Sequence, residues 1–383
     1  MKRIAFIIPQ LDHNWTGGLN YYRSLLHAIQ LQKYQRYIPV VIVAPGLANS
    51  ALQLFPDIEV LSTDMLSRLR PLHIVRKLCD RIFTRDLLLE RYLRQQKISI
   101  SSHGPALGQG ASIPNLCWVP DFQHRHLPQY FTADEIEQRK KRNLRLARGC
   151  SAMIVSSETA KADAVLELPE YKHKLRVLPF VPKLSDSPIK SLESLEHKFQ
   201  FSGRYLFLPN QFWAHKNHRI IVDALSILKR QDGADVQVIC TGSLTDYRNP
   251  SHFSDLSGVV KDKRLGSSIR ILGVLPYEEM FSLMFHAHAI INPSKFEGWS
   301  TTVEEAKLLE KPLLLSSIPV HHEQAQSNAC FFDGQDAQKC ADALLLAWNK
   351  PSPAVRLDYQ ERAQSALIAF GQRFCDLLDA TTT

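Results

Sequence analysis

The stretch HAIINPSKFEGWSTTVEEAKLLEKPLLLSS, residues 288–317, decides the fold class of this protein. A short run of apolar residues stands near each end of it, at about 288–292 and 312–316. Between these runs, a turn rich in hydroxyl groups leads into a segment of helical character near 301–310. Apolar strands that alternate with helices are typical of parallel sheets covered on both faces. The stretch therefore predicts a strand–helix–strand unit of a doubly wound α/β domain.

The same alternation continues outward along the chain. Further strands are predicted near 3–8, 38–44, 58–61, 98–101, 115–119, 152–156, 175–178, 205–209, 236–241, 269–272 and 329–332. Helices are predicted near 18–33, 67–96, 134–148, 157–166, 217–231, 277–286 and 336–348. The segment 181–203 has two prolines, many serines and no strong periodicity, so it is interpreted as a linker. We expect two Rossmann-like α/β domains with parallel sheets, over 1–180 and 204–359, followed by a helix at about 360–380.

Composition indicates a globular chain in a reducing compartment. With 383 residues, 45% of them apolar, the chain is long enough for two domains. No apolar run approaches the ~18–20 residues that span a bilayer, and the apolar N-terminus MKRIAFIIPQLD is too short for a signal peptide. The seven cysteines are scattered without a CxxC pair, which argues against disulfides and a structural zinc site. We expect a cytoplasmic protein.

Positive charge is concentrated in the first half of the chain. Residues 66–97, LSRLRPLHIVRKLCDRIFTRDLLLERYLRQQK, contain nine basic and three acidic residues, with apolar residues at helical spacing. A solvated helix face is one interpretation of this segment. The other is a surface that meets an anionic membrane, at the inner face of the cytoplasmic membrane, or an acceptor that carries phosphate. No helix-turn-helix, RRM or zinc-finger pattern is present, so nucleic acid is not expected as a partner.

Two loops of the first half follow strands, where ligands of doubly wound domains bind. Gly17 and Gly18 open a helix and would let the backbone approach a phosphate or sugar, although a plain loop-to-helix turn explains the pair equally well. Asp121, His124 and His126 could accept a hydrogen bond from a sugar hydroxyl or act as a base, or they could form an ordinary loop. The His-x-His pair has no third metal ligand of suitable spacing nearby.

Three loops of the second half also follow strands. Lys216 stands at the start of a helix, where a cation and free N–H groups together suit a diphosphate. Gly242 is a position at which the backbone could approach a ligand closely. The loop Gly273–Tyr277 could hydrogen-bond a nucleotide base with its backbone while a side chain packs on the face of the base.

The opening stretch carries two glutamates that need separate explanations. Thr301 with Glu304, or Thr302 with Glu305, fits a capping box at the start of the helix. Glu297 precedes that helix and cannot complete such a box. A sugar nucleotide is long enough to touch both Glu297 and Glu305, because carboxylates accept hydrogen bonds from diols well.

These residues resemble a known family. EGWSTTVEE, in which seven residues separate two glutamates, follows NPSKF and resembles the signature of retaining glycosyltransferases of family 4, which have the GT-B fold. The segment PNQFWAHKNH after a strand and the glycine pair of the first loop are similar to the same family in order and spacing. The resemblance covers essentially the whole chain and implies that the helix at about 360–380 packs back on the N-terminal domain. The segment WVPDFQHRHLPQYF is similar to one in bacterial members that build polysaccharides such as lipopolysaccharide.

The resemblance implies roles for individual residues. Glu297 would hold hydroxyls of the donor sugar, Glu305 the ribose diol, and Lys216 would neutralise the diphosphate. His124 or Asp121 would contact the sugar near the reacting carbon, so these two, Glu297 and Lys216 are the candidates for catalysis. The other implied donor-binding residues are Gly17, Gly18, Asn210, Gln211, Gly242, Gly273, Tyr277, Ser294, Gly298, Trp299, Ser300, Thr301 and Thr302. The family often has an arginine where Asn210 stands, so a second cation must come from elsewhere, with Arg219 as the candidate.

The activity implied by the resemblance is transfer of a sugar, with retention, from a nucleotide-diphosphate donor such as GDP-mannose to a hydroxyl of a glycan or lipid-linked acceptor. No metal or other cofactor is expected, since no DxD-type carboxylate pair follows a strand. Two alternatives remain at this point. One is a sugar-nucleotide epimerase of the same architecture, and the other is a non-catalytic protein that binds nucleotide sugars.

Overall fold

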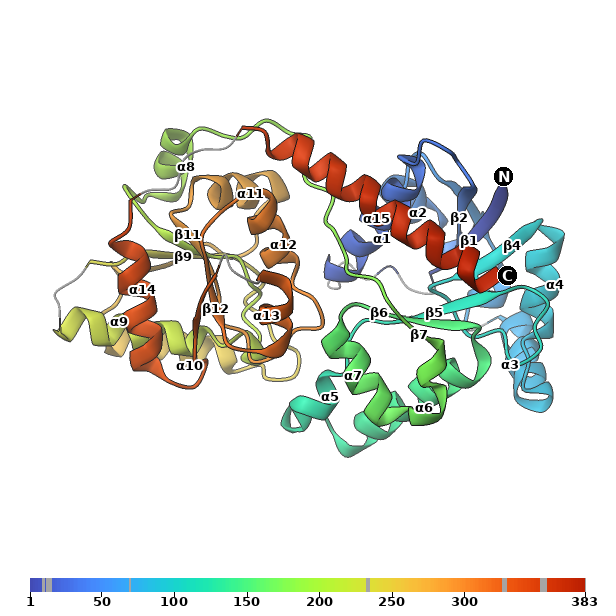
Figure 1. Ribbon diagram of the computed structural model, residues 1–383. Coiled ribbons are helices and arrows are strands. Elements are labelled where there is room, and N and C mark those ends of the chain that lie inside the picture. The colour runs from blue at the N-terminus through green and yellow to red at the C-terminus, as the bar shows by residue number, and fades with distance from the viewer. Residues whose placement is uncertain are drawn as a thin grey trace. The chain divides into compact units, whose positions relative to one another are not determined.

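The structure is a computed structural model that describes residues 1–8, 11, 16–68, 70–231, 235–325, 329–351 and 357–382. The chain divides into two compact units (Figure 1). Unit 1 consists of Met1–Lys183 together with Gln364–Thr383, and unit 2 consists of Leu184–Ala363. Unit 1 is thus assembled from two segments of chain that unit 2 separates.

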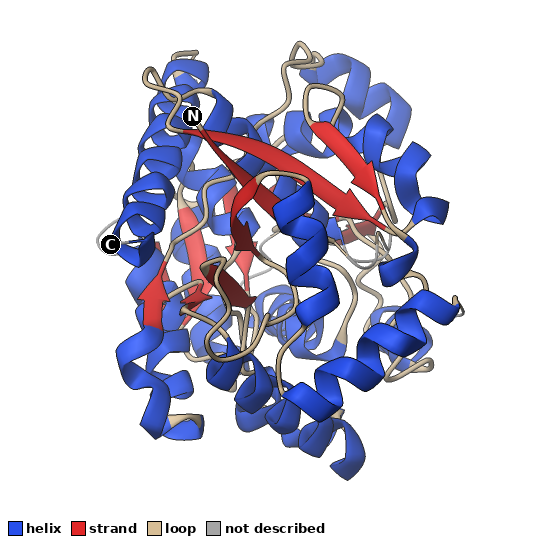
Figure 2. Cartoon of the chain, turned by 90° about the vertical axis from the view of Figure 1, so that its right-hand side faces the viewer, coloured by secondary structure: helices blue, strands red, loops and turns tan. Residues whose placement is uncertain are grey.

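The sheet of unit 1 has seven strands in the order β3-β2-β1-β4-β5-β6-β7, and every pairing is parallel. Its inner strands are buried almost throughout because helices cover both faces. Figure 2 shows the strands between helices. The strands are β1 Lys2–Ile7, β2 Tyr37–Val43, β3 Glu59–Ser62, β4 Ile98–Ser102, β5 Asn115–Val119, β6 Ala152–Val155 and β7 Leu175–Val177.

Seven helices of unit 1 lie between consecutive strands of its sheet in the described part of the chain. Local capping defines several of their starts; for example, Thr132 and Glu135 form a full capping box at α6. The helices are α1 Thr16–Gln30, α2 Ala48–Leu54, α3 Pro71–Phe83, α4 Leu87–Gln95, α5 Gln123–His126, α6 Ala133–Gly149 and α7 Glu158–Glu167.

The last helix, α15 Tyr359–Thr382, completes unit 1 with its residues from Gln364 onward. Phe370 and Phe374 on this helix are fully buried. A Cβ at Gly371 would lie 2.1 Å from the carbonyl oxygen of Ala28 in α1, so the two helices approach too closely for any side chain there. Arg36 adds an ion pair to Asp376 of 2.8 Å.

Unit 2 has a six-stranded sheet in the order β10-β9-β8-β11-β12-β13, which is again parallel throughout. Two apolar clusters, one on each face, form its core. The strands are β8 Leu206–Leu208, β9 Val238–Cys240, β10 Ile269–Ile271, β11 Ala289–Asn292, β12 Leu313–Ser316 and β13 Ala329–Phe332. The helices are α8 Leu192–Phe199, α9 His218–Gln231, α10 His252–Asp262, α11 Tyr277–His286, α12 Thr301–Leu308, α13 Pro319–Ala325 and α14 Ala337–Trp348.

The expected α/β fold with two parallel sheets is confirmed, and three local expectations are corrected. The helix expected near 67–96 is two helices, because Thr84 adopts a left-handed backbone and Asp86 caps α4 by accepting from the N–H of Leu89. The segment expected as a linker contains α8, which Ser191 caps. The helices α2, α5, α10 and α13 lie where none was expected. No helix in the described ranges is long and apolar enough to cross a membrane.

Candidate functional site

The candidate site lies in unit 2, where β8 and β11 end side by side. These strands pair in parallel, so the loops that follow them leave the same edge of the sheet. The loop after β8 leads to Lys216, and the loop after β11 contains Glu297. The shared edge brings together charged residues that stand 81 positions apart in the sequence.

Lys216 and Glu297 form a nearly buried ion pair. The ammonium Nζ of Lys216 lies 2.6 Å from Oε1 of Glu297, and the two side chains are 17% and 9% exposed. The Ser294 hydroxyl donates to the same carboxylate oxygen over 2.7 Å. Burial opposes the negative charge, but the nearby ammonium and these hydrogen bonds outweigh it and hold the pKa of Glu297 below its usual value. An anionic ligand could therefore compete with Glu297 for the ammonium of Lys216.

Asn292, at the end of β11, holds the surrounding polar side chains in position. It is fully buried, and its amide donates to the hydroxyl of Ser300 over 2.8 Å. Its carbonyl oxygen accepts from the Asn210 amide over 3.1 Å and lies 2.7 Å from Ser294 Oγ. This network fixes the loop that carries Glu297, because each buried polar group has a defined partner. Sequence reasoning missed Asn292, although an asparagine that ends an apolar strand was a visible signal.

The start of α12 differs from the expected capping boxes. Ser300 is the N-cap residue, and its hydroxyl accepts from the N–H of Val303. The amide of Gln324 in α13 bonds both the N–H and the carbonyl of Ser300, and it also donates to Glu304 over 3.0 Å. Thr302 donates to Asn210 over 3.3 Å. Neither predicted Thr–Glu box forms, because Glu304 turns to α13 and Glu305 turns to α11.

Glu305, like Glu304 beside it, is a buried carboxylate of this region. Its Oε1 accepts a hydrogen bond of 2.7 Å from the hydroxyl of Tyr277, the first residue of α11. Burial raises the pKa of Glu305 to about 7, against the hydrogen bond from Tyr277, which favours the ionised form. Burial and the neighbouring Glu305 also raise the pKa of Tyr277. Glu305 is thus a carboxyl group that gains or loses its proton near neutral pH.

The glycine at position 242 keeps two loops in contact. Its φ is +133°, and a Cβ there would lie 2.6 Å from the carbonyl oxygen of Asn210. Its N–H donates to the carbonyl of Gly273 over 2.8 Å. The loops after β8, β9 and β10 therefore lie together at the end of the parallel sheet where ligands bind. They bring together Asn210, Gln211, Gly242 and Gly273. Gly298 and Trp299 are half-buried in the loop after β11, and Thr301 is half-buried in the first turn of α12.

Sequence reasoning also missed His321 of α13. This residue is fully buried, and its Nδ1 contacts the backbone carbonyl of Ser316 over 2.9 Å. Its Nε2 has no hydrogen-bond partner among the described residues. Burial lowers the pKa of His321, against the charge of Glu297, which raises it. A neutral imidazole therefore lies within electrostatic reach of the Lys216–Glu297 pair.

The predicted sugar-contacting residues of unit 1 lie in α5 or just before it, and their contact with a sugar stays a prediction. His124 is buried, and its Nε2 lies 2.8 Å from Glu167. The Nε2 of His126 lies 2.8 Å from Asp163. Both carboxylates belong to α7, so these imidazoles join α5 to α7, and the side chain of His126 remains 43% exposed. Asp121 accepts from the N–H of Gln123, and its side chain remains 33% exposed.

The glycine pair of the first loop begins α1, as expected. Gly17 is exposed, and a Cβ there would meet nothing within 4 Å. Gly18 is buried in the same first turn. The loop that precedes the pair, residues 12–15, lies outside the described residues, so the approach of its backbone to a ligand stays a prediction.

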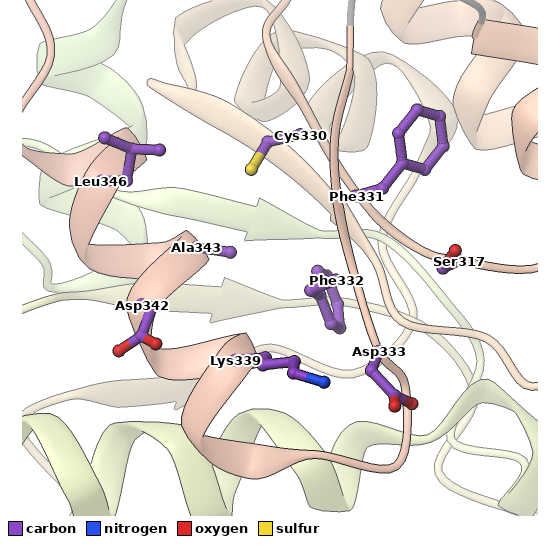
Figure 3. A pocket seen from close by; sticks show the side chains of 9 residues that line it. All are labelled: Ser317, Cys330, Phe331, Phe332, Asp333, Lys339, Asp342, Ala343 and Leu346. Carbon is purple, nitrogen blue, oxygen red and sulfur yellow. The ribbon is translucent and has the colours of Figure 1, made fainter.

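A hollow of about 610 Å³ lies elsewhere in unit 2, between β13 and α14 (Figure 3). Lys339, Asp342, Ala343 and Leu346 line it from the helix, and residues Cys330–Asp333 line it from the strand. Lys339 is already within 3.6 Å of Asp336. None of the predicted donor-binding residues lines this hollow. In the ranges that the structure describes, no group of three or more His, Cys, Asp or Glu residues could hold a metal ion.

Comparisons with known proteins bear on the family and the fold of the chain. Residues 196–365 match the family model of glycosyl transferases group 1. The chain is 25% identical over 140 residues to the O-antigen chain mannosyltransferase RfbU of Salmonella typhimurium, a match that covers 37% of each protein. A glycosyltransferase from Rickettsia africae has the same fold with a TM-score of 0.68 at 14% identity, over 100% of this chain and 99% of that one. Anabaena Alr3699/HepE, solved with UDP-glucose, has a TM-score of 0.69 at 15% identity, over 99% of this chain and 100% of that one.

Proposed function

Because the chain carries a domain of the glycosyl transferases group 1 family over residues 196–365 on a GT-B fold, we propose that it is a glycosyltransferase. The protein would move a sugar from a nucleotide-diphosphate donor to a hydroxyl of a glycan or lipid-linked acceptor. GDP-mannose or another nucleotide hexose would be the donor, configuration would be retained, and the product would be a surface polysaccharide. The O-antigen mannosyltransferase among its relatives supports this choice of pathway and sugar.

The observation that carries the proposal is the Lys216–Glu297 pair, held at 2.6 Å in a nearly buried setting. In the free protein, Glu297 neutralises the ammonium. A bound diphosphate would compete for that ammonium, and Glu297 would be left to accept hydrogen bonds from sugar hydroxyls. One lysine would then serve two anions in turn, and the protein would bury no uncompensated cation while its site is empty.

Departure of the nucleoside diphosphate is the step that needs electrostatic help. Negative charge builds on the leaving phosphate while positive charge builds at the anomeric carbon. Lys216 would stabilise the leaving charge, together with the N–H groups of Thr301 and Thr302 in the first turn of α12, where the intrahelical bonds have not yet begun. We propose that these groups act without a metal ion. The acceptor hydroxyl would lose its proton to the departing phosphate.

Tyr277 and Glu305 suit the nucleoside end of the donor. The carboxyl of Glu305 would accept both hydroxyls of a ribose, and the backbone at Gly273 would bond the base. Gly242 would keep the intervening loops close together. In unit 1, we propose Asp121 or His124 for contact with the sugar near the reacting carbon; Nε2 of His124 is bonded to Glu167 of α7, and its Nδ1 has no partner among the described residues. We also propose a cytoplasmic location, with contact between the basic unit 1 and the inner face of the membrane.

Donor screening tests this function. We expect one class among GDP-, UDP-, dTDP- and ADP-sugars to raise the melting temperature, because a ligand at 100 times its Kd stabilises a protein by about 2.7 kcal/mol. The matching donor should yield a glycosylated product when a lipid-linked or glycan acceptor is added. If the donor alone is isomerised, the protein is an epimerase. Binding without any turnover of donor or acceptor would contradict the proposed activity.

Donor affinity should rise with pH through neutrality. The pKa of Glu305 is about 7 in the free protein, and hydroxyl donors from a ribose favour the ionised carboxylate, so its pKa falls when the donor binds. Binding then releases a proton, and we expect affinity for a nucleotide sugar to increase roughly tenfold or more from pH 5.5 to 7.5. Calorimetric titration in buffers of different ionisation enthalpy measures both the affinity and the number of protons released on binding. Glu305→Gln should flatten the profile, and an unchanged profile in that variant would remove Glu305 from the ribose site.

A further inference from the structure

Helix α3 of unit 1 is packed with its polar face inward. Arg76, which is 2% exposed, forms a buried ion pair of 2.6 Å with Asp86 and donates to the carbonyl of Met65 over 3.0 Å. His73 bonds the same carbonyl over 2.8 Å. Asp80 pairs with Arg145 of α6. These polar contacts fix the rotation of the helix about its axis, so the opposite face must point away from the unit.

The outward face of α3 is apolar. Ile74, Leu78 and Ile82 follow one another at intervals of four residues, which places them in one row along the helix. With their neighbours they form a surface that we call the α3 apolar face, whose side chains are 41–64% exposed: Leu72, Ile74, Val75, Leu78, Ile82 and Phe83. A contiguous apolar patch of this kind is unusual on a soluble protein unless something covers it.

Exposed basic residues lie on α3 itself and on α6, the helix to which it is joined. The Asp80–Arg145 ion pair joins α3 to α6, whose residues 139–148 include exposed Lys140, Lys141 and Arg142. Arg81 on α3 is also exposed. Leu144 of α6, 45% exposed, adds apolar surface next to the ion pair. An apolar stripe bordered by lysine and arginine matches a bilayer surface in which acyl chains lie beneath anionic headgroups.

We propose that the α3 apolar face inserts into the interface of an anionic membrane, with the basic residues of α3 and α6 on the headgroups. The helix has 13 residues, about 20 Å in length, which is too short to cross a bilayer, so it lies in the membrane plane. This inference extends the proposed function, because an enzyme that serves a lipid-linked acceptor gains from residence at the surface that carries it. The occupant is a lipid surface and not a second copy of the chain, whose identical basic border would repel it.

Vesicle flotation tests the membrane face with the full chain. We expect the protein to float with vesicles of 70% phosphatidylcholine and 30% phosphatidylglycerol, and much less with phosphatidylcholine alone. The triple variant Ile74→Ser, Leu78→Ser, Ile82→Ser should lose at least tenfold in partition coefficient. The matched control is Leu166→Ser, on α7 of the same unit, which removes an apolar side chain that is 68% exposed. A Phe83→Trp variant should show a blue-shifted emission only with anionic vesicles.

Three outcomes would overturn the proposal: no flotation with anionic vesicles, equal flotation of the triple variant, or a dimer in sedimentation velocity that only the triple variant abolishes. Activity on a short water-soluble acceptor separates this proposal from the proposed function. The triple variant should keep that activity and its melting temperature, because the altered side chains are exposed. A wild-type chain that floats but transfers no sugar would refute the function and leave the membrane face intact.

Discussion

Replacing Lys216 by alanine should lower kcat/KM by about 10²- to 10³-fold, or roughly 2.7–4 kcal/mol of transition-state stabilisation. The variant removes the cation that would neutralise the departing diphosphate. It also leaves the carboxylate of Glu297, 9% exposed, without its ion-pair partner. Steady-state kinetics with the donor identified by screening measure the loss, and product release should be excluded as the slow step by single-turnover measurements.

Lys307→Ala is the matched control for this prediction. Lys307 lies on α12 in the same unit and forms an ion pair of 3.0 Å with Glu304, but its side chain is 38% exposed. We expect its kcat/KM to stay within about threefold of the wild type, because exposed pairs contribute little. If Lys216→Ala also stayed within about threefold, which is under ~0.7 kcal/mol, Lys216 would have no role at the diphosphate.

The second large effect is expected from Glu297→Gln. The amide keeps the shape of the side chain but not its charge, so it can neither hold the ammonium of Lys216 by ion pairing nor bond sugar hydroxyls as strongly. We expect kcat to fall by about 10²-fold, with a smaller change in the melting temperature than in activity. The double variant Lys216→Ala, Glu297→Gln should lose scarcely more than either single variant, because the two side chains form one unit.

Glu310→Gln provides the comparison for Glu297→Gln. Glu310 follows α12, and its side chain is 43% exposed. Its loss should leave kcat unchanged within error. Strict additivity of the Lys216 and Glu297 effects in the double variant would show that the two residues act separately, and the exchange of the ammonium between carboxylate and diphosphate would then be wrong.

Both sheets were predictable because their strands are continuous apolar runs. The runs AIIN of β11 and LLLS of β12 are apolar on both faces of the strand, so both faces must be covered by other elements. Strands covered on both faces are typical of parallel sheets, which could therefore be predicted. The break between α3 and α4 was not predictable. Neither glycine nor proline marks it, and it depends on the left-handed backbone of Thr84 and on the buried pair between Arg76 and Asp86.

The part of the candidate site that could be predicted consists of residues placed in loops directly after predicted strands. Glu297 and Lys216 could be proposed because each follows a strand, and the structure pairs them. The contacts of Ser300 with Gln324 were not visible, since Gln324 belongs to a helix that sequence reasoning missed. The positions of His124 and His126 were also hidden, because their carboxylate partners stand 43 and 37 residues later on α7.

Unit 1 is built from two separate segments of chain, and this limits the order in which the two units can fold during synthesis. Unit 2 is one continuous segment, so all of its strands and helices leave the ribosome before the residues from Gln364 onward. Unit 1 lacks Phe370 and Phe374, both fully buried, until those residues appear. The first 183 residues must therefore wait, with the apolar surface under α15 uncovered, while the second unit is translated and folds.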